Sequence, residues 1–190
     1  MELAAEIAAK RDRLLAWLRE HTRVAVAFSG GVDSAVVAQA AWLACGSAAL
    51  AITADSPSVP RAELAAAQQL AKQIGITHII LPTQEVEQPE YRRNDGLRCY
   101  YCKTELYTCI AQYLRSHGEL ENQWTIVSGA NRDDVGDFRP GLQAAAEQGV
   151  RHPLLEVGLG KAEVRALARY WGLPIWDKPA SPCLSSRLAP

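Results

Sequence analysis

The sequence predicts an α/β fold, in which a doubly wound parallel sheet is covered by helices on both faces. Short apolar runs alternate with segments of helical periodicity, an order that is typical of strand, helix, strand units. A polar, glycine-rich stretch follows the first apolar run, at the end of the strand where such sheets bind ligands. With 190 residues, of which 48% are hydrophobic, the chain is long enough to bury a core.

The periodicity places the elements of this fold in order along the chain. The first segment has its leucines on one side of a helix. A later helix is bounded by Pro60 in its first turn and by Gly75 just past its end. The expected helices cover about residues 2–20, 33–44, 60–74, 100–116 and 161–171, with a further alanine-rich, helix-forming stretch at 142–147. The expected strands cover 24–28, 48–53, 77–82, 124–129 and a short stretch near 150–154.

The chain is expected to divide into three regions. Residues 1–20 form an N-terminal packing helix, residues 21–175 form the α/β domain, and residues 176–190 begin a further region. The sequence stops at SSRLAP, directly after a polar loop that ought to lead into another element. We therefore expect a truncated C-terminal part.

Composition and charge exclude several classes of function. The formal net charge of -1 gives no basic field that would recruit nucleic acid. No apolar run reaches the roughly 18 residues that cross a bilayer, and charges interrupt the N-terminal segment, unlike a signal peptide. We expect a cytoplasmic protein with no nucleic-acid or membrane partner, whose five cysteines stay reduced.

The stretch SGGVDS, residues 29–34, lies between an apolar strand and a helix. The N-terminus of a helix presents free N–H groups and the positive end of the helix dipole. Glycines let the backbone approach an anion, and serines add hydroxyl donors. The junction therefore suits a phosphate or pyrophosphate, although it has neither the lysine of GxxxxGKS/T nor the spacing of GxGxxG. An ordinary βα loop with a tight glycine turn is the alternative.

Two cysteines cluster at Cys99 and Cys102, three residues apart at the start of a helix. Both thiols then lie on one helical face, and the helix N-terminus together with Arg98 and Lys103 favours their thiolate form. Two thiolates can hold a metal. Taken alone, the pair could be half of a zinc site, a redox pair or two buried apolar residues.

The other cysteines lie in different surroundings. Cys183 is in a polar loop, KPASPCLSSR, that has no apolar periodicity. Cys109 follows Cys102 by about two helical turns, roughly 10 Å, which is too far to share one ion. We expect Cys109 and Cys45 to be core residues.

The six residues SGGVDS resemble the PP-loop of the ATP pyrophosphatase superfamily. The resemblance implies that the loop grips the β,γ-diphosphate while ATP is cleaved to AMP and pyrophosphate, with Mg2+ bridging phosphate oxygens. SGANRDD, residues 128–134, resembles a family motif near the nucleotide, and adenine usually lies after the second strand. The implied ATP-binding residues are Ser29, Gly30, Gly31, Val32, Asp33, Ser34, Thr53, Ser56, Gly129, Asn131 and Asp133. Asn131 and Asp133 could equally be loop caps.

Five motifs in order look like those of the LarE-type sulfur transferases, which build the nickel-pincer nucleotide cofactor. They are SGGVDS, RCYYCK, GANRDDVGDFRPG, HPLLEVGLGKAEVRALARYWGLP and KPASPCLSSR. The resemblance implies that the chain adenylates a carboxylate of a pyridinium dicarboxylate mononucleotide and converts it to a thiocarboxylate. It implies Cys183 and Asp33 as catalytic residues and Ser185, Ser186 and Arg187 as substrate-binding residues.

Members of this family differ in their source of sulfur. Some sacrifice a single cysteine at the position of Cys183, whereas three-cysteine members hold a [4Fe-4S] cluster on thiolates that match Cys99, Cys102 and Cys183. This chain has all three cysteines, so the resemblance implies the cluster, in which three thiolates leave one iron open for sulfide from a sulfur donor. Zinc on the same thiolates is the alternative. The family also implies a homo-oligomer.

Two other functions stay open at this point. One is a PP-loop tRNA thiolase or another sulfur-inserting, adenylating enzyme. The other is a non-catalytic nucleotide-binding module with a structural zinc, which would bind ATP without releasing pyrophosphate.

Overall fold

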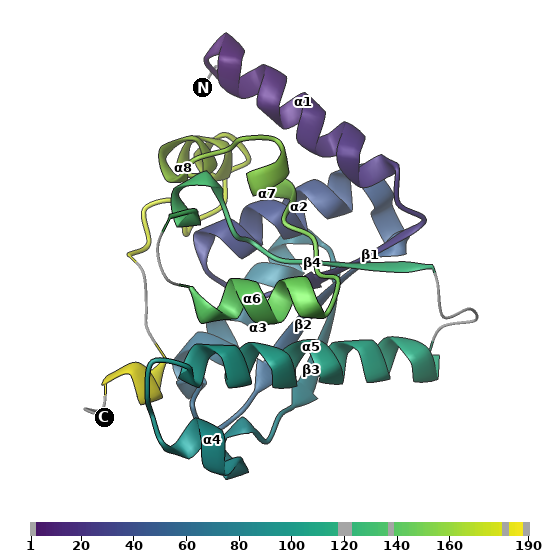
Figure 1. Cartoon of the computed structure of the whole chain (residues 1–190). Helices are drawn as coiled ribbons and strands as arrows, with labels where there is room; N and C mark the ends of the chain where they lie inside the picture. Colours follow the sequence, from purple (N-terminus) through teal and green to yellow (C-terminus); the bar gives the residue numbers. More distant parts are fainter. Residues whose placement is uncertain (1–2, 118–122, 137–138, 180–182, 188–190) are drawn as a thin grey trace.

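The computed structural model describes residues 3–117, 123–136, 139–179 and 183–187, and contains a parallel sheet of four strands (Figure 1). The strands are β1 (Arg23–Ala27), β2 (Ala49–Asp55), β3 (Thr77–Pro82) and β4 (Trp124–Val127). The longer helices are α1 (Ala5–Arg19), α2 (Val32–Cys45), α3 (Arg61–Ile74), α5 (Arg98–His117), α6 (Pro140–Glu147) and α8 (Lys161–Tyr170). Shorter helical segments are η1 (Gly46–Ala48), η2 (Glu85–Glu87), α4 (Pro89–Arg92), η3 (Arg132–Asp134), α7 (Pro153–Glu156) and η4 (Leu184–Arg187).

The strand order is β3-β2-β1-β4, and every pairing is parallel. The chain therefore runs outward from β1 through β2 to β3, and then returns through α5 to place β4 on the other side of β1. The direction in which successive strands are added to the sheet therefore reverses between β1 and β4. In open α/β sheets the crevice at the carboxyl ends of such a strand pair is where ligands bind.

Helices cover both faces of the sheet, which confirms the doubly wound architecture. On one face, α1, α2, α3 and α8 pack in a single apolar core that includes Leu14, Val36, Leu70 and Leu167. On the other face, α5 and α6 pack against β1 and β2 in a second core around Ile110. Figure 1 shows α5 and α6 side by side in front of the sheet. β1 lies between the two cores, which explains why it is an uninterrupted apolar run.

Most expected elements are confirmed within a few residues of their bounds, and two segments differ. The strand expected near 150–154 is a single parallel bridge between Val127 and Arg151, followed by α7. Pro153 has no N–H with which to continue the ladder, and it occupies the first turn of α7 instead. The charged stretch after β3, for which no element was expected, contains the short helix α4 that begins at Pro89.

The N-terminal helix is present as α1, and the alanine-rich stretch at 142–147 lies in α6. Within the described part of the chain, no helix combines the length and apolar character that a membrane crossing requires.

Candidate functional site

The loop from Ser29 to Ser34 joins β1 to α2 at the switch between β1 and β4. Two glycines allow its close packing. Gly30 has φ +72°, and an added Cβ would lie 3.0 Å from the Cβ of Ala67 in α3. At Gly129, just after β4, an added Cβ would lie 2.7 Å from the backbone nitrogen of Ser34. Because real Cβ atoms do not approach backbone so closely, the loops after β1 and β4 meet only if residue 129 is glycine.

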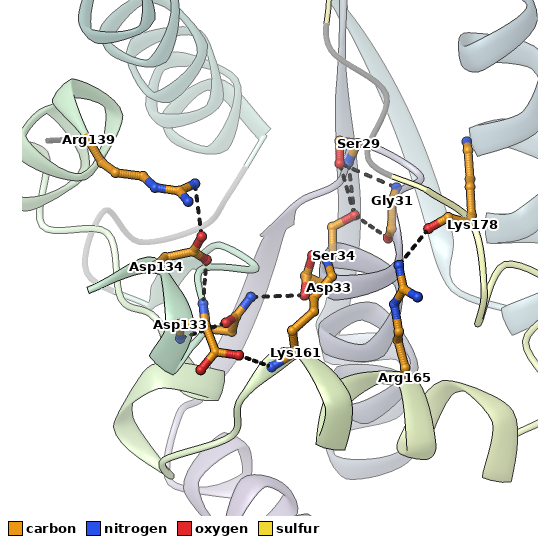
Figure 2. A network of polar contacts seen from close by, with 11 residues as sticks. Ser29, Gly31, Asp33, Ser34, Asp133, Asp134, Arg139, Lys161, Arg165 and Lys178 are labelled. Carbon is orange, nitrogen blue, oxygen red and sulfur yellow. Dashed lines mark hydrogen bonds and ion pairs between the residues drawn. The ribbon is translucent and has the colours of Figure 1, made fainter. Parts of the chain in front are cut away.

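The first turn of α2 has the geometry expected of an anion site. Gly31 is the N-cap and provides no side chain to cover the first amides of the helix. The Ser34 hydroxyl donates to the Gly31 carbonyl at 3.0 Å and accepts from the Ser29 amide at 3.2 Å, which closes the loop on itself (Figure 2). The amides and the positive end of the helix dipole are therefore held in place without a bound anion.

Asp33 joins three segments that are far apart in the sequence. Its Oδ1 accepts from the Asn131 side-chain amide at 3.1 Å, and its Oδ2 is paired with the Lys161 ammonium at the start of α8. The Lys161 amide donates in turn to Asp133 at 2.7 Å. Figure 2 shows this network between α2, α8 and the loop after β4. Both carboxylate oxygens of Asp33 thus have protein partners.

Sequence reasoning missed Lys161. It pairs with Asp33 and lines the same cavity as Ser29 and Gly31. A signal was available, because a lysine in the first turn of a helix faces the positive end of the dipole and is unfavourable there without an anionic partner.

Asn131 is a loop cap and also contacts Asp33. The side-chain oxygen of Asn131 accepts from the Asp133 backbone amide at 2.9 Å, and the backbone amide of Asn131 donates to the Asp134 carboxylate at 3.0 Å, which together form a capping box. Its side-chain nitrogen donates to Asp33. Asp134 is also paired with Arg139 at 2.9 Å. One buried residue therefore fixes the loop and orients the carboxylate of Asp33.

Thr53 and Ser56 lie at the end of β2, and their hydroxyls are bonded inside the protein. Thr53 donates to the Phe28 carbonyl at 2.6 Å and contacts His78 Nε2 at 2.7 Å. Ser56 shares a hydrogen bond of 2.7 Å with Ser58. Burial lowers the pKa of His78, so the imidazole is neutral beside Thr53. This edge of the site is held by internal hydrogen bonds.

Two cavities border the loop. One of about 500 Å3 is lined by Ser29, Ser34, Cys99, Lys103 and Arg139, among others. The other, of about 290 Å3, is lined by residues that include Ser29, Gly31, Asp33, Lys161 and Cys183. A groove of about 620 Å3 between α1 and α7 touches none of these residues. Cys99 thus lines one cavity beside the loop, and Cys183 lines the other.

Cys102 lies within electrostatic range of the other two candidate ligand cysteines, Cys99 and Cys183. Burial raises the pKa of the Cys102 thiol to about 11, and Lys103 lowers it, while Glu85, Cys183 and Cys99 raise it further. The expectation that the surroundings favour the thiolate form is therefore wrong for Cys102. Among the described residues, no group of three His, Cys, Asp or Glu side chains is placed to hold a single metal ion. The thiols are neighbours but do not form a closed shell for one ion.

The remaining cysteines have bonds of their own. Cys45 donates to the Leu18 carbonyl at 3.4 Å beside the core, and Cys109 donates to Glu105 at 3.7 Å. Burial raises the pKa of Cys109 to about 11, which keeps this thiol protonated.

The expected substrate residues lie in η4. The Ser185 hydroxyl accepts from the Tyr91 phenol at 2.9 Å, and its carbonyl accepts from Arg98 at 3.1 Å. Ser186 and Arg187 are in the same helical segment, and their side chains lie outside the described part of the structure.

Comparison with known proteins begins with the asparagine synthase family, which matches residues 13–94. The chain is 45% identical to an uncharacterized protein of Synechocystis sp., over 94% of this chain and 65% of that protein. It is 33% identical to the pyridinium-3,5-bisthiocarboxylic acid mononucleotide synthase of Lactiplantibacillus plantarum, over 96% of this chain and 65% of the synthase. The chain thus spans about two thirds of the length of these curated relatives.

Solved structures share its architecture. The NH3-dependent NAD synthetase of Campylobacter jejuni superposes with a TM-score of 0.68 at 18% identity, covering 94% of this chain and 80% of the synthetase. The NMN synthetase of Francisella tularensis gives a TM-score of 0.64 at 20% identity, covering 95% of this chain and 76% of that protein. At these identities the likeness shows the fold. The chain therefore has the fold of these synthetases, and its sequence is similar to the bacterial pyridinium-3,5-bisthiocarboxylic acid mononucleotide synthase over 65% of that protein, in keeping with its LarE-type motifs.

Proposed function

We propose that this protein is an ATP-dependent sulfur transferase of nickel-pincer nucleotide biosynthesis. In this proposal it adenylates a carboxylate of a pyridinium dicarboxylate mononucleotide and converts the product to a thiocarboxylate. The synthase to which it is 33% identical is named for such a bisthiocarboxylic acid. The observation that carries the proposal is that Cys183 lines one cavity with Ser29, Gly31 and Asp33, so a thiol faces the anion-binding loop.

In the first step, a carboxylate oxygen of the acceptor attacks the α-phosphorus of ATP, and pyrophosphate leaves. The uncapped amides of α2, held by the contact between Ser29 and Ser34, bind the β,γ-diphosphate. Lys161 lies beside Asp33 in the same cavity and adds a positive charge for the departing pyrophosphate. Asn131 and Asp33 orient that lysine. These groups are in place before ATP binds, which favours stabilisation of the charge that develops.

ATP is proposed to enter with Mg2+, which bridges its phosphate oxygens. Asp33 would contact the ion only by exchanging one of its present partners, Asn131 or Lys161. The direct role of this carboxylate is therefore proposed to be the placement of Lys161. Thr53 and Ser56 are proposed to border the adenine from the end of β2.

In the second step, sulfide attacks the carbonyl carbon of the acyl adenylate, and AMP leaves. Cys99, Cys102 and Cys183 are proposed to hold a [4Fe-4S] cluster, since thiols are the donors that such clusters use and Cys102 lies within electrostatic range of the other two. When bound, the cluster would supply an iron without a protein ligand, where the sulfide is carried. Lys103 lies within electrostatic range of all three thiols and lowers the pKa of Cys102, against the burial that raises it.

The acceptor is an anionic nucleotide, and Ser185, Ser186 and Arg187 are proposed to bind its phosphate or the leaving AMP, because an arginine fork matches phosphate geometry. The proposal also includes sulfide or a sulfur donor as partner, assembly as a homo-oligomer and a cytoplasmic location. It includes no nucleic-acid partner, in keeping with the net charge of -1.

The proposal is tested by anaerobic purification, followed by iron, zinc and acid-labile sulfide analysis and an absorption spectrum, with Cys99→Ala as the comparison. We expect about four irons with sulfide per chain, and their loss in the variant. Stoichiometric zinc without sulfide would contradict the cluster.

A second assay separates catalysis from simple nucleotide binding. Pyrophosphate release is measured with and without pyridinium dicarboxylate mononucleotide, and the product is identified by mass. Acceptor-dependent release is expected, and Asp33→Asn should reduce it. ATP binding without pyrophosphate release would instead identify a non-catalytic nucleotide-binding module.

A further inference from the structure

The turn that carries Cys183 is held by contacts from three separate elements. The Leu184 amide donates to the Ser58 carbonyl at 3.0 Å, in the loop after β2. Tyr91 in α4 donates to the Ser185 hydroxyl at 2.9 Å, and Arg98 at the start of α5 donates to the Ser185 carbonyl at 3.1 Å. Each partner is far from the turn in sequence, so these bonds decide where the turn lies.

Among these contacts, the bond from Tyr91 is the one made between two side chains. Tyr91 is 4% exposed, although α4 is a single turn at the surface of the fold. Burial raises the pKa of its phenol, hydrogen bonds with Ser185 and Ser58 lower it, and the neighbouring Cys102 and Cys183 raise it. The phenol therefore stays protonated and donates its hydrogen at physiological pH. It also lies within electrostatic range of a thiol on α5 and of the thiol on the turn.

We propose that Tyr91 is a positioning residue that holds Cys183 beside Cys102 by donating its hydroxyl hydrogen to Ser185. α4 then connects the helix that carries the CxxC pair with the turn that carries the third cysteine. This inference rests on the proposed function, because it explains how thiols from distant segments come to one place. It makes no use of bound metal and can be tested on the metal-free chain.

The test measures the proximity of two thiols directly. The full chain, with Cys45, Cys99 and Cys109 replaced by alanine, keeps Cys102 and Cys183. After treatment with chelator and reductant, it is reacted with dibromobimane, whose two arms each lose bromide to a thiolate and which fluoresces once both have reacted. The cross-linking rate is divided by the rate of single alkylation with monobromobimane, which corrects for thiol reactivity.

We expect efficient cross-linking in this parent and about a fivefold lower ratio in Tyr91→Phe, the effect of losing one net hydrogen bond. Ser185→Ala should give the same loss, Ser185→Thr should restore the ratio, and the double variant Tyr91→Phe/Ser185→Ala should lose no more than either single change. The matched control is Tyr100→Phe, which removes a phenol that donates to Glu147 at 2.5 Å on the other side of α5. It should leave the ratio unchanged.

Each contrary outcome has a distinct meaning. An unchanged ratio in Tyr91→Phe would overturn the positioning role and leave the proposed function standing. A lower thermal midpoint in Tyr91→Phe, with no change of ratio in Ser185→Ala, would show a purely structural role and overturn it as well. Absence of cross-linking in the parent would overturn both this inference and the three-thiol site. If the expected cross-linking ratios are found but the wild-type chain binds no iron, the inference is upheld and only the cluster is contradicted.

Discussion

The loop proposed to bind phosphate and the proposed cysteine set are built in different ways. The loop is one continuous stretch, Ser29 to Ser34, whose backbone is closed by internal contacts of Ser29, Gly31 and Ser34, although Asp33 also reaches Asn131 and Lys161. The cysteines come from α5 and from a turn that follows Cys102 by some eighty residues, and distant partners such as Ser58 and Tyr91 place that turn. Local chemistry therefore defines the first region, and tertiary packing defines the second.

This difference shows which changes each region tolerates. The loop depends on backbone shape, so it should fail when a Cβ is forced into it at Gly30 or Gly129. The cysteine set depends on side chains that reach across the fold, so it should fail by losing one contact while the loop still binds ATP. Three experiments separate the two regions, and a fourth tests the stability of the fold that carries both, from the largest expected effect to the smallest.

The largest effect is expected for Cys183→Ala. The change removes one of the three proposed cluster ligands, so sulfur transfer should fall at least ~1,000-fold, as on loss of an essential catalytic group. ATP binding should be unchanged, because the amides of α2 remain. Thiocarboxylate formation and nucleotide affinity are measured on the same preparation. Cys109→Ala is the control, and transfer that survives in Cys183→Ala would contradict the assigned role.

Gly129→Ala is expected to have the opposite effect, which is to weaken ATP binding and leave the cysteine set in place. The new Cβ would lie 2.7 Å from the Ser34 nitrogen and 2.9 Å from the Asp33 carbonyl carbon, so the first turn of α2 must move. An overpacking cost of roughly 2 kcal/mol corresponds to about 30-fold weaker ATP binding, measured by calorimetry. Thiol cross-linking between Cys102 and Cys183 should persist. Gly96→Ala is the matched control, because a Cβ there meets open space; equal losses in both variants would refute the packing argument.

A smaller effect is expected for Lys161→Gln. The variant removes the positive charge beside Asp33, in a pair whose side chains are 38% and 24% exposed. Because water screens such a pair, we expect about a tenfold decrease in pyrophosphate release rather than its abolition. The rate of pyrophosphate release is measured in assays stopped at fixed times. Lys72→Gln, on the exposed side of α3, should have no effect, and a similar decrease in both variants would mean that Lys161 acts only through net charge.

The smallest effect is a decrease in stability at acid pH. Burial lowers the pKa of His78 and His152 below the ordinary value of 6.5. Above pH 6.5 these histidines are neutral in both the folded and the unfolded chain, and the fold has its full stability. As the pH falls below 6.5, the histidines of the unfolded chain bind protons before those of the folded chain, so the free energy of unfolding decreases. Urea unfolding from neutral to mildly acid pH measures the slope. His78→Gln should reduce that slope, and the exposed His117→Gln should not; an unchanged slope in His78→Gln would exclude His78 as a contributor.

The sequence by itself determined the features that depend on neighbouring residues. Alternation of apolar runs and helical periods predicted the parallel sheet, because each strand is buried on both faces and each helix on one. The loop at Ser29 to Ser34 and the Cys99 and Cys102 pair were visible because their spacing alone carries their chemistry. Pro60 and Gly75 marked the limits of α3 through their own backbone preferences.

Only the tertiary structure decided which distant residues meet. Lys161 faces Asp33 because α8 packs on α2, and no pattern within the chain contains that contact. The segment after α6 forms only a bridge at Arg151, because the packing pairs it with Val127 and Pro153 then ends the ladder and begins α7. Tyr91 reaches Ser185 through an α4 that periodicity did not predict, since one helical turn is too short to show a period. Long-range contacts are set by packing of the whole chain, whereas turns, caps and periodic faces are set by residues a few positions apart.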